Sequence, residues 1–182
     1  MLLAENQVIE RNIDHLPSGN ILLVDLLDDS ALSEFSTLRP DINWFGYTPF
    51  FDTWQKFSNA NVGKAEQVFF SEWLQQKHIS NINLSSDEQT SDLFDAVVIY
   101  FPKTKLRFDY YLSMISKYLT SDATIYVVGE KKGGVKNCAK ALTPYVIKAN
   151  KLDSARHCIM FSGAFNQYRC NKTLDDWYQI KK

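Results

Sequence analysis

The chain has 182 residues, of which 45% are apolar and 14% aromatic, and this composition fits one domain with a full hydrophobic core rather than a disordered chain. No apolar run approaches the roughly 18 residues that a membrane span needs, and the N-terminus lacks the basic and apolar regions of a secretory signal. The three cysteines are widely spaced without a CxxC pair, which argues against a disulfide framework or a zinc site and favours reduced thiols. We therefore expect a cytoplasmic protein without a membrane partner or a bound metal.

The charged residues are distributed unevenly along the chain. The net charge is −1, but residues 1–100 carry 5 Lys and Arg against 15 Asp and Glu, a net of −10. Residues 101–182 carry 15 Lys and Arg against 6 Asp and Glu, a net of +9. Such a split either reflects an ordinary solvated surface or gives the protein a basic face, and basic faces commonly bind phosphates.

Apolar segments of strand length alternate with helix-like segments. Residues 20–27 (NILLVDLL) form a continuous apolar run, which is typical of a strand buried on both faces of a parallel sheet. A second strand that runs into a Pro-containing loop is expected at 42–51, and further strands are expected at 64–73, 94–103 and 123–130. Helices are expected at 2–13, from Asp29 or Ser30 to 38, at 105–119 and at 134–142. The polar residues 75–92 are expected to form a loop or a short helix.

The chain continues with two successive β-like segments, 145–155 and 156–165. Residues 153–156 (DSAR) are the predicted tight turn between them, with Asp153 bonding the backbone. Strands that alternate with helices and end in an antiparallel pair predict an α/β doubly wound sheet, mostly parallel, with helices on both faces. This order also fits the Rossmann-like class I methyltransferase architecture, in a single domain over residues 1–182.

The stretch VVGEKKGGVK (127–136) follows the fifth strand. A nucleotide-binding P-loop needs GxxxxGK followed by Ser or Thr. Gly129 and Gly134 have the right separation, but Lys136 comes one place late and Asn137 replaces the hydroxyl, so no ATP or GTP site is predicted. Two interpretations remain: a glycine-rich turn with exposed lysines, or a loop that faces phosphate, since amides at a helix start and lysines both attract anions.

The residues that would bind a methyltransferase cofactor or perform catalysis are missing. After the first strand, VDLLDDSAL (24–32) has leucines and aspartates where a nucleotide-binding fold has glycines, so the leucines would crowd a cofactor. The fourth strand ends in YFPK (100–103), which lacks the polar residue and second proline of an N/D-PP-Y/F/W motif. Tyr100 and Phe101 are interpreted as packing residues. No catalytic, cofactor-binding or metal-binding residue is assigned, and the three histidines have no partner motif.

Basic residues accompany aromatic ones near the ends of the fourth and fifth strands. Lysine and arginine pair with phosphates and aromatic rings stack on bases, a mixture that suits RNA, although solvated lysines are the alternative. We expect these residues to form one surface along the strand ends. The candidates for RNA contact are Lys103, Lys105, Lys131, Lys132, Lys136 and Arg156. They belong to a wider set that also contains Arg107, Lys140, Lys148 and Lys151.

Three stretches together bear a resemblance to a known family: IYFPKTK (99–105), VVGEKKGGVK (127–136) and NKLDSARHC (150–158). In order and spacing they resemble the N-terminal domain of the bacterial 16S ribosomal RNA guanine-N2 methyltransferases, the RsmC family, over about residues 8–178. The resemblance implies a degenerate methyltransferase-like domain that does not bind cofactor and assists RNA binding and folding of its partner. In the family, a C-terminal domain, absent from this chain, binds S-adenosylmethionine (SAM) and carries the catalytic motif.

Together, the residues and the resemblance predict a non-catalytic domain that supports rRNA recognition. Its expected partners are 16S rRNA or the 30S subunit and the C-terminal catalytic domain, and no cofactor is expected in this chain. Two alternatives remain open: an active small SAM-dependent methyltransferase with an unusual cofactor site, and a scaffold that docks the catalytic domain without touching RNA. An apolar patch left exposed where that domain packs would also allow self-association.

Overall fold

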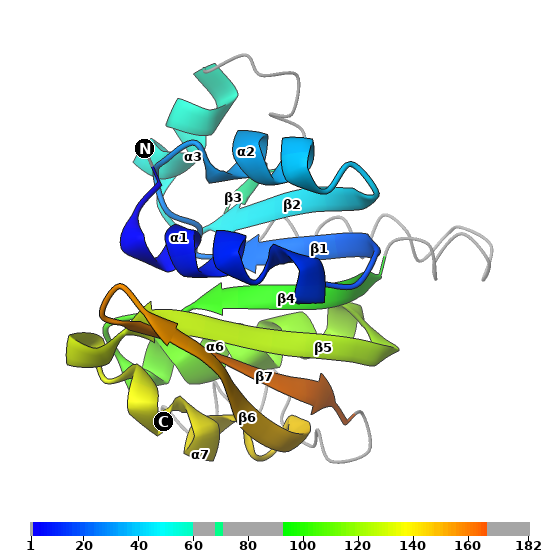
Figure 1. Cartoon of the computed structure of the whole chain (residues 1–182), viewed down its shortest axis with the longest axis vertical. Helices are drawn as coiled ribbons and strands as arrows, with labels where there is room; N and C mark the ends of the chain where they lie inside the picture. Colours follow the sequence, from blue (N-terminus) through cyan, green and yellow to red (C-terminus); the bar gives the residue numbers. More distant parts are fainter. Residues whose placement is uncertain (1, 60–67, 71–92, 167–182) are drawn as a thin grey trace.

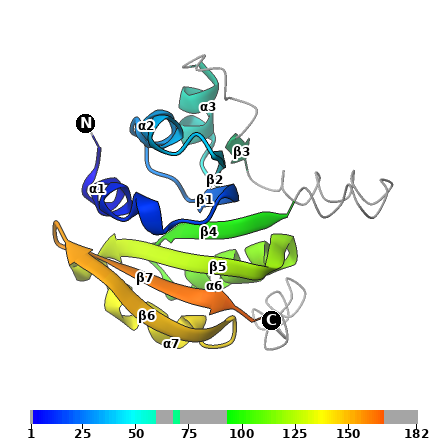
Figure 2. The same ribbon diagram turned by 45° about the vertical axis from the view of Figure 1, so that its right-hand side comes forward.

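The computed structural model describes residues 2–59, 68–70 and 93–166, whose arrangement is shown in Figures 1 and 2. In this part of the chain, seven strands form one sheet in the order β3-β2-β1-β4-β5-β7-β6. The parallel strands are β1 (Gly19–Val24), β2 (Ile42–Thr48), β3 (Val68–Phe70), β4 (Phe94–Tyr100) and β5 (Leu119–Glu130). The antiparallel hairpin consists of β6 (Val146–Ala155) and β7 (Cys158–Phe165), and β7 also pairs antiparallel with β5. The predicted fold, mostly parallel with a C-terminal hairpin, is confirmed.

Helices cover both faces of the sheet, which explains the continuous apolar run in β1. On β1, Ile21 and Leu23 point to the face covered by α1 (Ala4–Arg11) and α2 (Ala31–Leu38). Leu22 and Val24 point to the other face, covered by α6 (Lys105–Ile115) and α7 (Cys138–Leu142). All four strand side chains are fully buried, because successive residues of a strand point to opposite faces.

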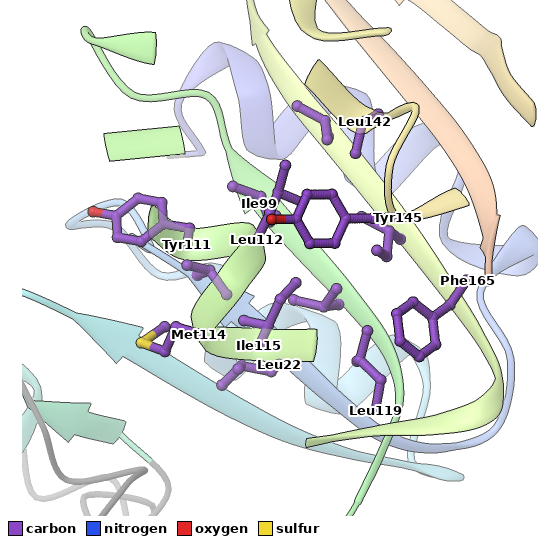
Figure 3. Close-up of a cluster of buried hydrophobic side chains, with 14 of the residues drawn as sticks. Leu22, Ile99, Tyr111, Leu112, Met114, Ile115, Leu119, Leu142, Tyr145 and Phe165 are labelled. Carbon is purple, nitrogen blue, oxygen red and sulfur yellow. The ribbon is translucent and has the colours of Figure 1, made fainter. Parts of the chain in front are cut away.

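The core on the α6 side is shown in Figure 3. Leu112 and Ile115 of α6 are fully buried in one cluster with Leu22 of β1, and each such side chain contributes roughly 1.5–3 kcal/mol by leaving water. Tyr145 lies in the same cluster, with its hydroxyl 3.0 Å from the hydroxyl of Ser113. The two buried hydroxyls therefore satisfy each other and add no unpaired polar atom to the core.

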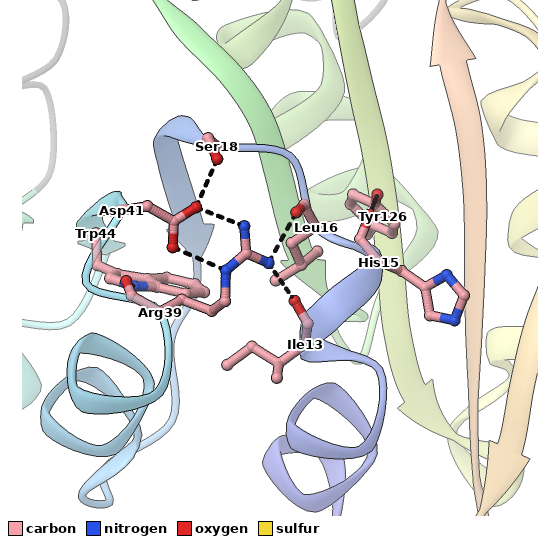
Figure 4. A network of polar contacts seen from close by, with 8 residues as sticks. All are labelled: Ile13, His15, Leu16, Ser18, Arg39, Asp41, Trp44 and Tyr126. Carbon is pink, nitrogen blue, oxygen red and sulfur yellow. Dashed lines mark hydrogen bonds and ion pairs between the residues drawn. The ribbon is translucent and has the colours of Figure 1, made fainter.

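Arg39 ties the end of α2 to the segment that precedes β1 (Figure 4). Its Nη1 donates to the carbonyl oxygens of Ile13 at 2.7 Å and Leu16 at 2.9 Å. Its Nε and Nη2 donate to the carboxylate of Asp41 at 2.9 and 2.8 Å, and the Ser18 hydroxyl donates to the same carboxylate. These donors hold the pKa of Asp41 well below its usual range, because they stabilise its charged form. The guanidinium group thus fixes how the chain enters β1.

The second strand runs into a Pro-containing loop, as expected for residues 42–51, but a helix follows it that was not predicted. β2 ends at Thr48 and α3 (Phe51–Asn59) begins soon after. Pro49 has no N–H with which to continue the ladder. The Thr48 hydroxyl accepts from the Phe50 N–H at 3.1 Å and closes a turn. Of the strand expected at 64–73, only 68–70 (β3) are described, and the loop expected at 75–92 lies outside the described residues.

The turn of the C-terminal hairpin lies two residues later than predicted. Arg156 and His157 form it, both in the left-handed region with φ of 53° and 62°, between two paired strand ends. Asp153 lies within β6 instead. One of its carboxylate oxygens accepts from the Ser154 N–H, and the other accepts from Asn12 Nδ2 at 2.8 Å and from the Arg11 guanidinium at 3.2 Å. Asp153 therefore ties the hairpin to the N-terminal helix, which sequence adjacency did not reveal.

Candidate nucleic-acid interface

The predicted RNA-contacting residues lie at the edge of the sheet where the parallel strands end, which we call the carboxyl edge. Lys103 and Lys105 follow β4, and Lys136 lies in a 3-10 turn between β5 and α7. The structure brings these three together in the lining of one cavity of about 610 Å³, which Lys140 of α7 also lines. We call it the lysine cavity. Lys140 was predicted only as a member of the wider basic set.

The lysine cavity has apolar walls and a basic rim. Phe101 and Phe108 lie in its wall with ring centroids 5.1 Å apart and an interplanar angle of 54°. The opposite wall comes from residues 133–134 and 136–141. All four lysines are exposed, and no acidic residue lines the cavity. Within the described residues, no ion pair involves these lysines, so their charges add to a local positive potential.

Local sequence places the two walls of this cavity. The Thr104 hydroxyl caps α6 by accepting from the Arg107 N–H at 3.2 Å, which sets Lys105 in the first turn of the helix. On the other side, Gly134 adopts a φ of 88°, a conformation that glycine reaches without strain. That glycine separates two short 3-10 turns and directs the chain toward α7. The helix expected at 134–142 is therefore α-helical only over α7.

The other three candidates lie beside the lysine cavity and do not line it. Lys131 and Lys132 begin the 3-10 turn after β5, and Arg156 lies in the hairpin turn. The two turns are adjacent, because the Lys131 N–H donates to the carbonyl of His157 at 2.9 Å. All three basic side chains are exposed. They form a neighbouring basic ridge, and the predicted set therefore divides into a cavity and a ridge.

A second, smaller cavity of about 290 Å³ adjoins the first, with Phe101 and Lys103 lining both. Phe50 and Arg107 also line it, and the Arg107 guanidinium lies 5.4 Å from the centre of the Phe50 ring. The position of Arg107 in the basic cluster was predicted, but Phe50 was missed. It belongs to the Pro-containing loop that was expected after the second strand, and nothing in the local sequence indicated that it would face α6.

Two side chains of the loop after β1, near the place where a Rossmann-like fold binds its nucleotide, are held by contacts within the fold. Leu26 is only 5% exposed, and its Cδ1 would lie 2.8 Å from a Cβ added at Gly46. The Asp29 carboxylate accepts from Asn6 Nδ2 and from two backbone N–H groups, all at 2.9 Å. Leu26 thus packs against β2, and Asp29 is bonded within the fold; that the leucines would crowd a cofactor stays a prediction.

Asp25 at the end of β1 also has an internal partner. Its Oδ2 accepts from the Tyr111 hydroxyl at 2.8 Å. Burial raises the pKa of Asp25, while the Tyr111 hydrogen bond and the Arg107 charge act in the opposite direction. Burial and the neighbouring Asp25 raise the pKa of Tyr111 well above its usual value. At neutral pH the tyrosine is therefore a hydrogen-bond donor that holds the carboxylate in place.

Tyr100 and Phe101 are packing residues, as predicted. Tyr100 is 4% exposed, and its hydroxyl donates to Asn6 Oδ1 of α1. Burial raises the pKa of Tyr100 well above its ordinary value. Phe101 packs against the α6-side core and against Phe108. Neither side chain presents the polar group that the missing catalytic motif would supply.

The described cysteines are buried and unpaired. Cys138 and Cys158 are buried free thiols, and burial raises the pKa of Cys138 to about 12 and that of Cys158 to about 11, so little thiolate forms at neutral pH. Over residues 2–59, 68–70 and 93–166, no group of three or more His, Cys, Asp or Glu side chains is gathered as a metal site. No helix of these ranges is long and apolar enough to cross a membrane.

The strand order, with a crevice between β1 and β4 at the carboxyl edge, defines a Rossmann-like methyltransferase fold. The Thermus thermophilus 16S rRNA methyltransferase RsmC, solved in complex with AdoMet and guanosine, has a TM-score of 0.60 at 10% identity, covering 89% of this chain and 38% of that chain. A precorrin-6y methyltransferase from Geobacter metallireducens has a TM-score of 0.54 at 14% identity, covering 88% and 87%. At such identities the likeness shows the fold alone.

Sequence relatives identify the particular family. The profile of the family described as "Methyltransferase small domain N-terminal" matches residues 6–180. The Ribosomal RNA small subunit methyltransferase C of Pseudoalteromonas atlantica is 33% identical over 182 residues, 100% of this chain and 48% of the relative. The protein of the same name from Shewanella halifaxensis is 37% identical over 185 residues, 99% and 49%. The chain belongs to this family as the N-terminal domain of an RsmC-type methyltransferase, which confirms the resemblance, and it spans about half the length of these relatives.

Proposed function

We propose that this chain is a non-catalytic domain that contacts 16S rRNA for a guanine-N2 methyltransferase. Its basic carboxyl edge contributes to binding of the rRNA or the 30S subunit, and the domain supports folding of the SAM-dependent catalytic domain. The observation that carries the proposal is the lysine cavity, in which four exposed lysines surround an apolar interior without an acidic residue. Phosphate backbones are the ligands that such a concentration of positive charge attracts.

SAM belongs, in this proposal, to the catalytic domain rather than to this chain. The loop after β1 supports the assignment, because Leu26 is buried there and Asp29 is already engaged by Asn6 and backbone amides. A cofactor seated in that loop would have to displace these contacts. The assignment is tested by calorimetric titration of SAM, and then S-adenosylhomocysteine, into the folded chain at tens of micromolar. We expect no heat of binding, and one-to-one binding would reopen the case for an active methyltransferase.

The RNA contact is tested by the salt dependence of binding to a 16S rRNA fragment. Each lost phosphate contact lowers the slope of log affinity against log salt by about 0.7 for a single strand or about 0.9 for a duplex. The double variant Lys103→Ala, Lys136→Ala removes two lysines of the cavity and should lower the slope by about 1.4 to 1.8. Adding Lys131→Ala and Lys132→Ala tests whether the site extends to the basic ridge.

A matched control keeps the change in net charge the same. Lys117 follows the C-terminal end of α6, and Lys148 lies near the beginning of β6, so both are exposed at the opposite edge of the sheet. The expectation that Lys148 joins the surface along the strand ends was therefore wrong. The double variant Lys117→Ala, Lys148→Ala should leave the slope unchanged. Equal effects of the two double variants would mean that only net charge matters. Absence of RNA binding, together with tight association with the separate catalytic domain, would replace the proposal with a docking scaffold.

A further inference from the structure

We propose that the carboxyl edge selects unpaired RNA, by stacking a base on the Phe50–Arg107 pair and placing the adjoining phosphates among the lysines of the lysine cavity. The inference deepens the proposed function, because it rests on RNA contact at this edge and names the kind of RNA. Its basis is the adjacency of the two cavities, the exposure of Phe50 and the arginine that lies over the phenyl ring.

The two cavities are neighbours along the edge, because Phe101 and Lys103 line both of them. In our proposal one strand occupies both and passes these two side chains. The smaller cavity presents an exposed aromatic ring, and the larger one presents lysines. This order matches a nucleotide chain, in which a flat apolar base alternates with a charged phosphate. Single-strand-binding surfaces combine these two features, an aromatic platform and a positive groove.

Phe50 is suited to be a platform because its backbone is held on both sides. Its N–H donates to the Thr48 hydroxyl at 3.1 Å, and its carbonyl accepts from the Trp54 N–H at 3.1 Å in the first turn of α3. The side chain is nevertheless 45% exposed, and an exposed phenylalanine at a fixed place offers a flat surface to a ligand. The Arg107 guanidinium, 5.4 Å from the ring centre, supplies a second flat and charged surface on which a base stacks well.

A duplex does not fit this arrangement. In an A-form helix the bases are stacked on each other, and the deep, narrow major groove keeps side chains from their faces. A duplex would reach the lysines at the rim but not the phenyl ring or the apolar walls. Asp25, the acidic residue that lines the smaller cavity, has Oδ2 engaged by Tyr111. Contact with Phe50 therefore requires a base that is free to unstack.

The test compares one RNA strand of about 12 nucleotides, within the usual site size of single-strand-binding folds, with the same strand annealed to its complement. Phe50→Ala removes the platform without changing charge. Phe51→Ala is the matched control, because Phe51 is 52% exposed, lies next in the chain and lines neither of these two cavities. Affinities are measured by fluorescence anisotropy between about 50 and 200 mM salt. Urea unfolding of both variants checks that they are folded.

We expect Phe50→Ala to lower the affinity for the single strand by about 5- to 150-fold, the range for loss of one base stack. The salt slope and the weaker duplex affinity should stay unchanged, and Phe51→Ala should bind like the unaltered chain. Equal affinities for single strand and duplex, or an unaffected Phe50→Ala variant, would overturn the selection of unpaired RNA while leaving RNA contact intact. Failure of both RNAs to bind would overturn the proposed function itself.

Discussion

Gly129, at the end of β5, allows a sharp test of why the stretch VVGEKKGGVK contains glycine. An alanine Cβ there would lie 2.7 Å from the Cβ of Phe101 and 3.2 Å from two side-chain carbons of Val135, whereas carbon contacts are normally about 3.5–4 Å. Phe101 cannot easily move away, because its N–H donates to the Val128 carbonyl at 2.8 Å and its ring packs on Phe108. The contact at Gly129 is thus a packing requirement and not an approach to phosphate.

The expected cost of Gly129→Ala follows from two opposing terms. Overpacking of a well-packed site costs about 1–3 kcal/mol, and the lower flexibility of alanine in a strand returns roughly 0.5–1 kcal/mol. Because the 2.7 Å contact is with a Cβ atom and not with a flexible side-chain end, the overpacking cost should lie in the upper part of its range, about 2–3 kcal/mol. The expected net loss is then about 1–2.5 kcal/mol, which for a urea m-value of about 2 kcal/mol/M lowers the unfolding midpoint by roughly 0.5–1.3 M. The measurement is urea unfolding followed by far-UV circular dichroism.

Gly133→Ala in the same loop is the control. A Cβ at Gly133 meets nothing closer than 4.0 Å, and its φ is not in the left-handed region, so alanine should be neutral or stabilising by up to about 1 kcal/mol. If Gly129→Ala proves as stable as Gly133→Ala, the packing argument is wrong. If it weakens RNA binding at unchanged stability, Gly129 would instead serve the approach of a ligand to the backbone.

Two further predictions concern stability. Arg39→Ala should lower the free energy of unfolding by about 2–3 kcal/mol, because it removes the charged donors to two carbonyl groups from a side chain that is only 15% exposed. Arg11→Ala is the control: the Arg11 side chain is 60% exposed in its ion pair, so its loss should cost less than about 1 kcal/mol. Equal costs of the two variants in urea unfolding would contradict this reasoning. Raising the pH should also destabilise the fold, because burial raises the pKa of Tyr118 and Cys138 to about 12 and of Cys158 to about 11, from ordinary values of 10 and 9. Because the folded state holds these protons more tightly than the unfolded state, the protonated side chains contribute fully to the free energy of unfolding below about pH 9. This contribution is lost as the pH rises through 11 to 12. A free energy of unfolding that stays constant over this range would refute the prediction.

The central strands could be predicted from sequence because burial on both faces leaves a local signature. β1 and β4 are continuous apolar runs, and both were expected within a few residues of their bounds. α3 had no such signature: its first residues, Phe51 onward, continue the aromatic run of β2, and the break depends on Pro49 and on a hydrogen bond from Phe50 to Thr48. The hairpin turn was predicted two residues too early, also because of a tertiary contact. Aspartate is a common turn residue, but Asp153 instead accepts hydrogen bonds from Arg11 of α1 and from Asn12, which follows α1.

The candidate site was predicted in part. Lysines near strand ends could be assigned to one edge, because the ends of parallel strands meet there, and Lys103, Lys105 and Lys136 do line one cavity. The sequence could not predict that the basic residues divide between the lysine cavity and the basic ridge. That division depends on the contact between the hairpin turn and the loop after β5, which is a tertiary contact. Phe50 could not be predicted either, because its contact with Arg107 joins segments 57 residues apart in sequence.

The structure also explains how a chain with a net charge of −1 can present a basic surface. Several acids of the first half are engaged within the fold: Asp25 by Tyr111, Asp28 by Lys56, Asp29 by Asn6 and Asp41 by Arg39. The lysines of the cavity have no such ion-pair partner among the described residues. Because exposed charges act mainly within a Debye length of about 8–10 Å at physiological salt, a phosphate at the carboxyl edge experiences the nearby lysines and not the sum over the chain. The polarity between the two halves of the sequence therefore produces a local basic surface only through the fold, which brings the ends of β4 and β5 together.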